Sequence, residues 1–512
     1  MEDQTTYSQS RIAKNTIILG VRMLITMGLT LLTSRILLSV LGVSDYGVYN
    51  IIGGIVVLLS VISNSMMSAT QRFITYEIGK GTVNSVTHVF SMSLIAHIII
   101  IGCIFILGET IGLWYVMNKL KIPEGRETAA FWVYQFTLLT VSVNLIRSPY
   151  NASVIAYEKM KFYAYMSVAE SIIKFLFVYV LTLIKHDTLL VIYAYFVLLS
   201  NLIILFCYNF YCRSKFQTCR FTFTIDREYF KKLFKFLGWS ILGGASTLGT
   251  QQAGNLIINK FLGVSVNAAY GIASQVSGAI SSFVSSFQMA FTPQITKLYA
   301  QNKMSQFYTL CNGSALISYY ILFLISFPII LNIDYVLNLW LVEVPPFAGK
   351  FCVLLIVYSL IDAIQAPFWI GINATGNIKV YEIWLSLLLF LNIPFSYFAL
   401  RADMPPYTIL LIRVVLNFLT AVIRTLHVKI QIKYPVIQYL KNVIIRALAV
   451  TSLSFVLWCN IPYDRYCTSF LHFVIISILV FISVIVFILT IGFGKSERSS
   501  IMSVIKNRLH IN

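Results

Sequence analysis

The chain has 512 residues, of which 58% are hydrophobic and 11% are charged, and its formal net charge is +19 at pH 7. With a mean hydropathy of +0.81, it cannot enclose one apolar core in a wetted surface, which excludes a single soluble globular domain. The apolar residues fall in windows of about 20, the length that spans roughly 30 Å of hydrocarbon, so we expect a polytopic membrane protein.

The predicted elements are about fourteen membrane-spanning helices, separated by charge clusters and by Gly, Pro or Asn breaks. Of the 38 Lys and Arg residues, 23 fall on the amino-terminal side of the membrane, 8 on the other side and 7 inside helices. Because cytoplasmic loops of membrane proteins carry an excess of Lys and Arg, we expect both termini in the cytoplasm. The basic charge then reflects the orientation of the chain in the membrane and does not indicate nucleic-acid binding. The helices cover residues 15–41, 47–69, 86–108, 129–150, 163–184, 188–211, 236–262, 266–292, 310–333, 347–371, 379–400, 406–428, 441–459 and 466–492.

The first helix is expected to stay in the chain, because its apolar stretch is too long for a signal peptide and lacks a small-residue cleavage pattern. It carries Arg22 and Arg35, and an arginine near a helix centre costs roughly 2.5–3.5 kcal/mol. Helical spacing places Asn15, Arg22, Thr26 and Thr33 within roughly 40° of one another, with Arg35 about 140° from Arg22. We interpret Arg22, Thr26, Thr33 and Arg35 as residues of a polar cavity. The alternative is that each arginine reaches the headgroups on its own side.

Acidic residues in two of the later helices are candidates for ion pairing. Glu170 and Lys174 are spaced i,i+4 in the fifth helix, so they are expected to neutralise each other, as a structural ion pair or as part of an ion-coupling site. Asp362 is the only acid well inside the tenth helix. It must pair with a cation, bind one or stay protonated, and Arg413 is its candidate partner. A coupling role for Asp362, with Na⁺ or H⁺ as the ion, is the less favoured alternative to an ion pair.

The seventh helix contains a ladder of uncharged polar side chains that recur every four residues: Thr247, Gln251, Asn255 and Asn259. Such side chains are costly against lipid. We therefore expect them to line a wet cavity, where they would contact sugar hydroxyls, or to pack against a neighbouring helix.

The sequence shows no signature of a metal or catalytic centre. The eight cysteines form no CxxC pair and have no His partners at metal spacing, so no metal or other cofactor is expected. Cys459 and Cys467 flank one external turn, and a disulfide between them has little support. There is no DxD, no phosphate loop and no external loop long enough for a catalytic domain, which favours a protein that is not an enzyme.

An internal repeat organises the chain. The segments "VLGVSDYGVYNI" (40–51) and "FLGVSVNAAYGI" (261–272) share six of twelve residues at an offset of 221. Each lies at a junction between two predicted helices, so we expect two parallel repeats related by an axis along the membrane normal. The predicted parts are an amino-terminal lobe at 1–211, a basic connector at 212–235 whose Phe, Tyr, Lys and Arg suit the membrane interface, a second lobe at 236–428, and two added helices with a cytoplasmic tail at 429–512.

These segments resemble a known family. The stretches "TSRILLSVLGVSDYGVYNI" (33–51), "QRFITYEIGKG" (71–81) and "RSPYNASVIAYEKMKFYA" (147–164), with the helix count, are similar to polysaccharide flippases (Wzx type) of the multidrug/oligosaccharidyl-lipid/polysaccharide (MOP) exporter superfamily. The resemblance implies an all-α MATE-like fold of two six-helix lobes plus two helices. It also implies a cationic cavity, and a groove for a polyprenyl tail at the last two helices.

The resemblance further implies a function and partners. The expected substrate is an undecaprenyl-pyrophosphate-linked oligosaccharide, a repeat unit of O-antigen, capsule or exopolysaccharide, moved across the bacterial inner membrane by alternating access. We expect a monomer that lies in the lipid bilayer and works beside a polysaccharide polymerase. The alternatives are a cation-coupled multidrug antiporter of the same superfamily and, in another class, a membrane-embedded polymerase or acyltransferase. Seven bases and few acids inside the helices favour an anionic substrate over a cationic one.

Overall fold

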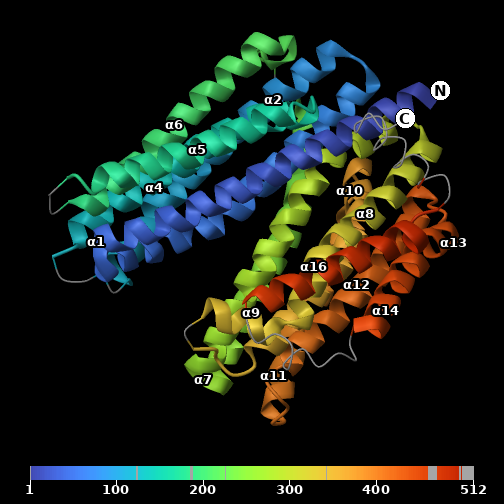
Figure 1. Ribbon diagram of the computed structural model, residues 1–512. Coiled ribbons are helices and arrows are strands. Elements are labelled where there is room, and N and C mark those ends of the chain that lie inside the picture. The colour runs from blue at the N-terminus through green and yellow to red at the C-terminus, as the bar shows by residue number, and fades with distance from the viewer. Residues whose placement is uncertain are drawn as a thin grey trace. The chain divides into compact units, whose positions relative to one another are not determined.

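In the computed structural model, all regular secondary structure of the described residues is helical (Figure 1). The described residues are 2–120, 122, 125–184, 188–224, 226–341, 343–458, 470–494 and 498, without the side chains of 2–14, 16–17, 43–44, 50–51, 54–58, 60 and 264. The helices are α1 (Glu2–Lys80), α2 (Val83–Leu107), α3 (Leu113–Asn118), α4 (Glu127–Ala156), α5 (Met160–Leu181), α6 (Leu189–Lys215), α7 (Arg227–Ala300), α8 (Met304–Leu331), α9 (Ile333–Trp340), α10 (Ala348–Thr375), α11 (Lys379–Arg401), α12 (Thr408–Ile432), α13 (Val436–Tyr439), α14 (Ile445–Trp458) and α16 (Phe470–Phe487).

Within the described part of the chain, 11 helices are long and apolar enough to cross a membrane, which confirms the prediction of an all-α polytopic membrane protein. The predicted spans at 236–262 and 266–292 form the two halves of α7, but neither half reaches the hydropathy of the 11. Their Gly, Ser, Thr, Gln and Asn residues are the cause. The predicted span at 47–69 is helical within α1 and includes side chains outside the described set.

Two glycines break the longest helices in the same way. Gly42 in α1 has φ 72° and ψ 173°, and Gly263 in α7 has φ 78° and ψ −174°. Side chains other than hydrogen are essentially excluded from this region of φ/ψ space. The two positions are separated by the predicted offset of 221 (263 − 42), so the matching "LGVS" segments encode matching backbone kinks.

The helices after each kink follow the same offset. The first residues of α2 (Val83) and α8 (Met304) are 221 positions apart in the sequence. The first residues of α4 (Glu127) and α10 (Ala348) are also 221 positions apart. The most extensive helix contact of each copy also corresponds, α4 with α6 and α10 with α12. The sequence repeat is therefore a duplication of a whole helical unit.

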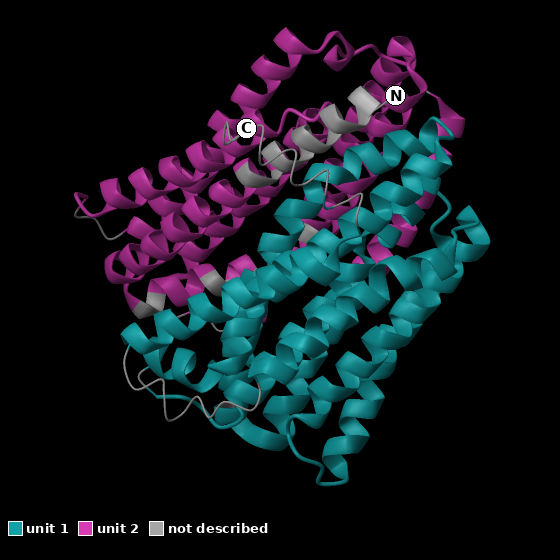
Figure 2. Ribbon diagram, turned by 45° about the vertical axis from the view of Figure 1, so that its right-hand side comes forward, with its two compact units in different colours: residues 1–14, 245–512 teal, residues 15–244 magenta. Residues whose placement is uncertain are grey.

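The chain divides into two compact units, residues 15–244 and residues 1–14 with 245–512 (Figure 2). In the first unit, Phe90, Tyr150 and Tyr208 pack in a core between α2, α4 and α6. In the second, α10 packs against α8 and α12, and Phe351 and Leu355 on α10 are buried in a core. The predicted lobe boundaries and the axis that relates the lobes stay predictions.

The two kinks yield a stability prediction. Gly42→Ala and Gly263→Ala should each destabilise the protein by about 1–3 kcal/mol, because alanine is strained at this backbone conformation. Thermal unfolding of the purified protein in detergent should show a lower melting temperature for both. Gly28→Ala and Gly278→Ala are matched controls, since a Cβ at these sites meets open space, and they should leave the melting temperature equal or higher. Equal melting temperatures for all four variants would contradict the account.

Candidate functional site

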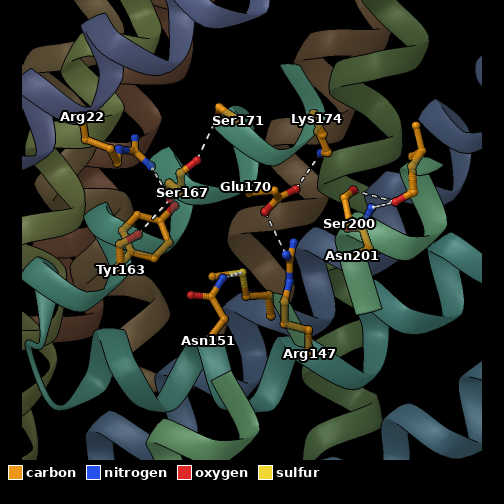
Figure 3. A network of polar contacts seen from close by, with 12 residues as sticks. Arg22, Arg147, Asn151, Tyr163, Ser167, Glu170, Ser171, Lys174, Ser200 and Asn201 are labelled. Atoms are coloured by element: carbon orange, nitrogen blue, oxygen red, sulfur yellow. Dashed lines mark hydrogen bonds and ion pairs between the residues drawn. The ribbon is translucent and has the colours of Figure 1, made fainter. Parts of the chain in front are cut away.

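Arg22 of α1 lies against α5 (Figure 3). Its Nη1 atom is 3.5 Å from the Ser167 hydroxyl, and its guanidinium carbon lies 5.0 Å from the centre of the Tyr163 ring. The side chain is half-buried. Hydrogen bonding and cation–π attraction each offset part of the cost of an arginine at this depth.

The α5 residues that face Arg22 belong to a longer polar stripe. At 100° per residue, the side chains of Tyr163, Ser167, Glu170, Ser171 and Lys174 fall within about 100° on one side of the helix. The hydroxyls of Ser167 and Ser171 donate to the carbonyls of Tyr163 and Ser167 in the preceding turn, at 2.9 and 3.1 Å. The stripe runs for about 16 Å along the helix, roughly half the thickness of the hydrocarbon.

The middle of this stripe is a charged triad. Glu170 accepts from Lys174 Nζ at 2.6 Å and from Arg147 Nη1 of α4 at 2.9 Å. The three side chains are 18% (Arg147), 20% (Glu170) and 36% (Lys174) exposed, so the triad is open on one side. Because one carboxylate serves two cations, the triad has a positive charge left over. The i,i+4 spacing indicated Glu170 and Lys174, but Arg147 is brought in by the packing of α4 on α5.

The other predicted residues of α1 do not join this network. Thr26 and Thr33 donate to carbonyls of their own helix, those of Met23 at 3.0 Å and Leu29 at 2.6 Å. Arg35 is exposed on the opposite face of α1 and makes no side-chain hydrogen bond or ion pair within the described part of the chain. The structure thus brings Arg22 to the stripe and leaves Arg35 apart from it.

The polar ladder predicted on α7 lies next to the side of that helix that packs against other helices. Thr247 and Asn259 are exposed, and Gln251 and Asn255 are half-buried. Beside the ladder, the hydroxyl of Thr250 donates to the carbonyl of Leu389 on the neighbouring helix α11 at 3.1 Å. The amide groups of Gln251, Asn255 and Asn259 have no hydrogen-bond partner among the described residues and remain available to a ligand or water.

The predicted partner of Asp362 is wrong. Asp362 Oδ1 lies 3.5 Å from Arg424 Nη1, whereas Arg413 donates to the Tyr270 hydroxyl at 3.2 Å. The register of two parallel helices explains this, because Asn417 of α12 donates to the carbonyl of Tyr358 on α10 at 3.0 Å. Asp362 lies one turn beyond that carbonyl, toward Arg424 and away from Arg413.

The described part of the chain gives little support for a metal site or a disulfide. No group of three or more His, Cys, Asp or Glu side chains is close enough there to hold a metal ion. Cys459 and Cys467 lie outside the described residues.

The triad predicts an asymmetric response to mutation. Glu170→Gln should destabilise the protein by about 1–3 kcal/mol, because it removes the only carboxylate between two cations. Lys174→Gln should cost less, since the Arg147–Glu170 pair remains. Melting temperatures of the two variants and of the double variant Glu170→Gln/Lys174→Gln measure this. The double variant should be more stable than Glu170→Gln alone, and a still lower melting temperature would show that the charges do not interact as described.

Comparison with known proteins places this arrangement in a family. The family model described as "Polysaccharide biosynthesis protein" matches residues 12–299, more than half of the chain. No curated protein matches significantly.

Solved structures match in fold. A crystal structure of a MATE mutant gives a TM-score of 0.71 at 15% identity, covering 82% of this chain and 96% of that one. A MOP superfamily transporter from Pyrococcus furiosus, reported with a binding pocket of reversed polarity, gives 0.69 at 17% identity over the same shares. An outward-facing multidrug resistance MATE transporter gives 0.68 at 15%, again over the same shares. The chain belongs to the polysaccharide biosynthesis protein family and has the fold of the MOP superfamily transporters.

Proposed function

We propose that the protein flips an undecaprenyl-pyrophosphate-linked oligosaccharide from the cytoplasmic to the periplasmic leaflet of the bacterial inner membrane. The observation that carries this proposal is the network on α1, α4 and α5, where Arg147 and Lys174 share one carboxylate, Glu170, and a third base, Arg22, contacts Ser167 on the same α5 stripe. Excess positive charge within a membrane domain is costly unless an anion uses it. A pyrophosphate is such an anion, and the family match supports a polysaccharide precursor as its carrier.

The geometry suits stepwise transfer of the anion. Arg22 and the Arg147–Lys174 pair lie along the α5 stripe, so a phosphate that leaves one cation is near the next. Guanidinium groups bind phosphate oxygens in pairs, while the lysine supplies a point charge. Each cation is already engaged by Ser167, Tyr163 or Glu170. Binding at each step is therefore weak enough to permit release.

The glycan needs a different surface. On α7, Gln251, Asn255 and Asn259 offer amide donors and acceptors that the described residues leave unused. Sugar hydroxyls require both kinds of group. The cationic surface lies on α1 and its neighbours, and the amide surface lies on α7, the helix that the repeat relates to α1. Duplication has therefore supplied two chemically distinct surfaces.

A multidrug antiporter is the second candidate, because the solved MATE structures share this fold. Its cationic substrates require an acidic pocket. The network in Figure 3 has three bases to one acid, which favours an anionic substrate. A polymerase or acyltransferase has no support from the family or the fold.

Arg22 provides the first functional test. Arg22→Ala should reduce export about 10- to 100-fold, the equivalent of losing a charged hydrogen bond of about 1.5–3 kcal/mol. Arg22→Lys should recover export in part, and Arg35 variants should show the same order with smaller losses. The measurement is surface polysaccharide in a strain that lacks its own transporter, normalised to inserted protein. Undiminished export by Arg22→Gln would mean that the guanidinium only anchors the helix.

The amide ladder provides a second test. The double variant Gln251→Leu/Asn255→Leu should insert normally and impair export in the same assay. Thr250→Ala is its control, because Thr250 makes the contact to α11. It should lower the melting temperature and leave export per inserted protein unchanged. Normal export by the double variant would show that the ladder serves packing alone.

A further inference from the structure

The basic connector at residues 212–235 is folded against the helices of its own unit, residues 15–244. Just after the end of α6, Phe216 stacks on Tyr157 with ring centres 4.4 Å apart. The Thr218 hydroxyl lies 2.8 Å from the Tyr157 hydroxyl, and Cys219 is buried in the core between α2, α4 and α6. The connector therefore has a defined position against these helices.

The next stretch, residues 220–224, runs along α2. The backbone N–H of Thr222 donates to the Ser91 hydroxyl at 3.0 Å, and the two hydroxyl oxygens are 3.2 Å apart. Two residues later, the Thr224 hydroxyl lies 3.3 Å from Nδ1 of His88. Alternate side chains of this stretch thus contact α2, and the stretch runs toward the start of that helix.

The residues beside these two threonines are phenylalanines. Phe221 is 46% exposed and Phe223 is 75% exposed. Because successive side chains of an extended chain point to opposite sides, both rings point away from α2. Counted from residue 86, where the predicted span begins, His88 lies about 3 Å and Ser91 about 8 Å along the helix. Aromatic rings at this depth meet the boundary between lipid headgroups and acyl chains.

The first turns of α7 carry bases on their free side. Leu233 and Phe236 are buried, on one side of the helix. Arg227, Lys231 and Lys235 recur every four residues and are exposed. At 100° per residue, the centre of these three bases lies about 170° from the centre of the buried pair. The helix therefore packs by its apolar side and presents a stripe of three positive charges on the other.

Both acids of the connector are already engaged. Asp226 accepts hydrogen bonds from the backbone N–H groups of Glu228 and Tyr229 at 2.9 and 3.0 Å, and it lies 3.2 Å from Nε2 of His88. Glu228 pairs with Lys232 at 2.6 Å. The three bases of the stripe form no ion pair with a described residue. Their charge is available to an anion from outside the chain.

We propose that Phe221 and Phe223, together with Arg227, Lys231 and Lys235, form a docking surface for the anionic phospholipids of the surrounding bilayer. The two rings enter the boundary of the acyl chains, and the three bases meet the headgroup phosphates. Clusters of bases beside a membrane-spanning helix attract anionic lipids. The position of the rings beside Ser91, inside the predicted span, favours a bilayer over a soluble acidic partner.

Binding of fluorescent phospholipids to the purified full-length protein in detergent tests the charge. The protein should bind phosphatidylglycerol more tightly than phosphatidylethanolamine, and added salt should reduce the difference. The stripe variant should bind phosphatidylglycerol about 10- to 100-fold more weakly, and the control variant should bind like the parent. The stripe variant is Arg227→Gln/Lys231→Gln/Lys235→Gln, and the control, at three exposed bases outside the connector, is Lys119→Gln/Lys260→Gln/Arg401→Gln.

The phenylalanines are tested without a change of charge. Phe221→Ser/Phe223→Ser should weaken the binding of phosphatidylglycerol, because the acyl chains lose their contact. Free glycerol phosphate, which has the charge and no acyl chain, should not displace the lipid. In nanodiscs, Phe223→Trp should add fluorescence that brominated acyl chains quench and that acrylamide in the water does not.

Three results would overturn the proposal: equal affinity of the parent for the two lipids, an unchanged affinity in the stripe variant, or an unchanged affinity in the phenylalanine variant. Quenching of the added tryptophan by acrylamide alone would also overturn it and leave the surface to a soluble partner. The comparison of the two lipids needs only the parent protein, so the proposal stays testable if a variant fails to fold. Transport enters none of these measurements. A protein that binds the lipid but exports no polysaccharide would refute the flippase and keep the docking surface.

Discussion

Placing ionised side chains inside a membrane is the constraint on which the rest of this structure depends. Such a charge is costly unless neighbouring protein groups offset it, because the hydrocarbon offers none. Arg22 is held by Tyr163 and Ser167, Glu170 joins α4 to α5, and Arg424 joins α10, α11 and α12. The polar contacts therefore fix which helices are neighbours and at what register.

The two copies of the duplicated unit carry different polar contacts. In the unit of residues 15–244, the network around Glu170 has more bases than acids. In the other unit, the base Arg424 pairs with one acid, Asp362. The repeated backbone, marked by the kinks at Gly42 and Gly263, is thus shared, while the charged groups that it carries differ.

Local sequence patterns predicted the features that depend on a single helix. The "LGVS" repeat located both kinks, and i,i+4 spacing located the Glu170–Lys174 contact. The same rule could have found Tyr163, Ser167 and Ser171. Periodicity carries no information on the register between helices, so Arg147 was not assigned to the triad and Arg413 was wrongly chosen over Arg424.

The central claim is that the unit of residues 15–244 recognises pyrophosphate through excess positive charge. The most direct measurement is binding of a short-chain, water-soluble isoprenyl pyrophosphate to the purified protein, in competition with the uncharged isoprenol and with a cationic dye. The account predicts that the pyrophosphate binds, that added salt weakens it, that Arg22→Ala and Arg147→Ala weaken it further, and that neither competitor displaces it. Tight binding of the dye with no measurable affinity for the pyrophosphate would contradict the account.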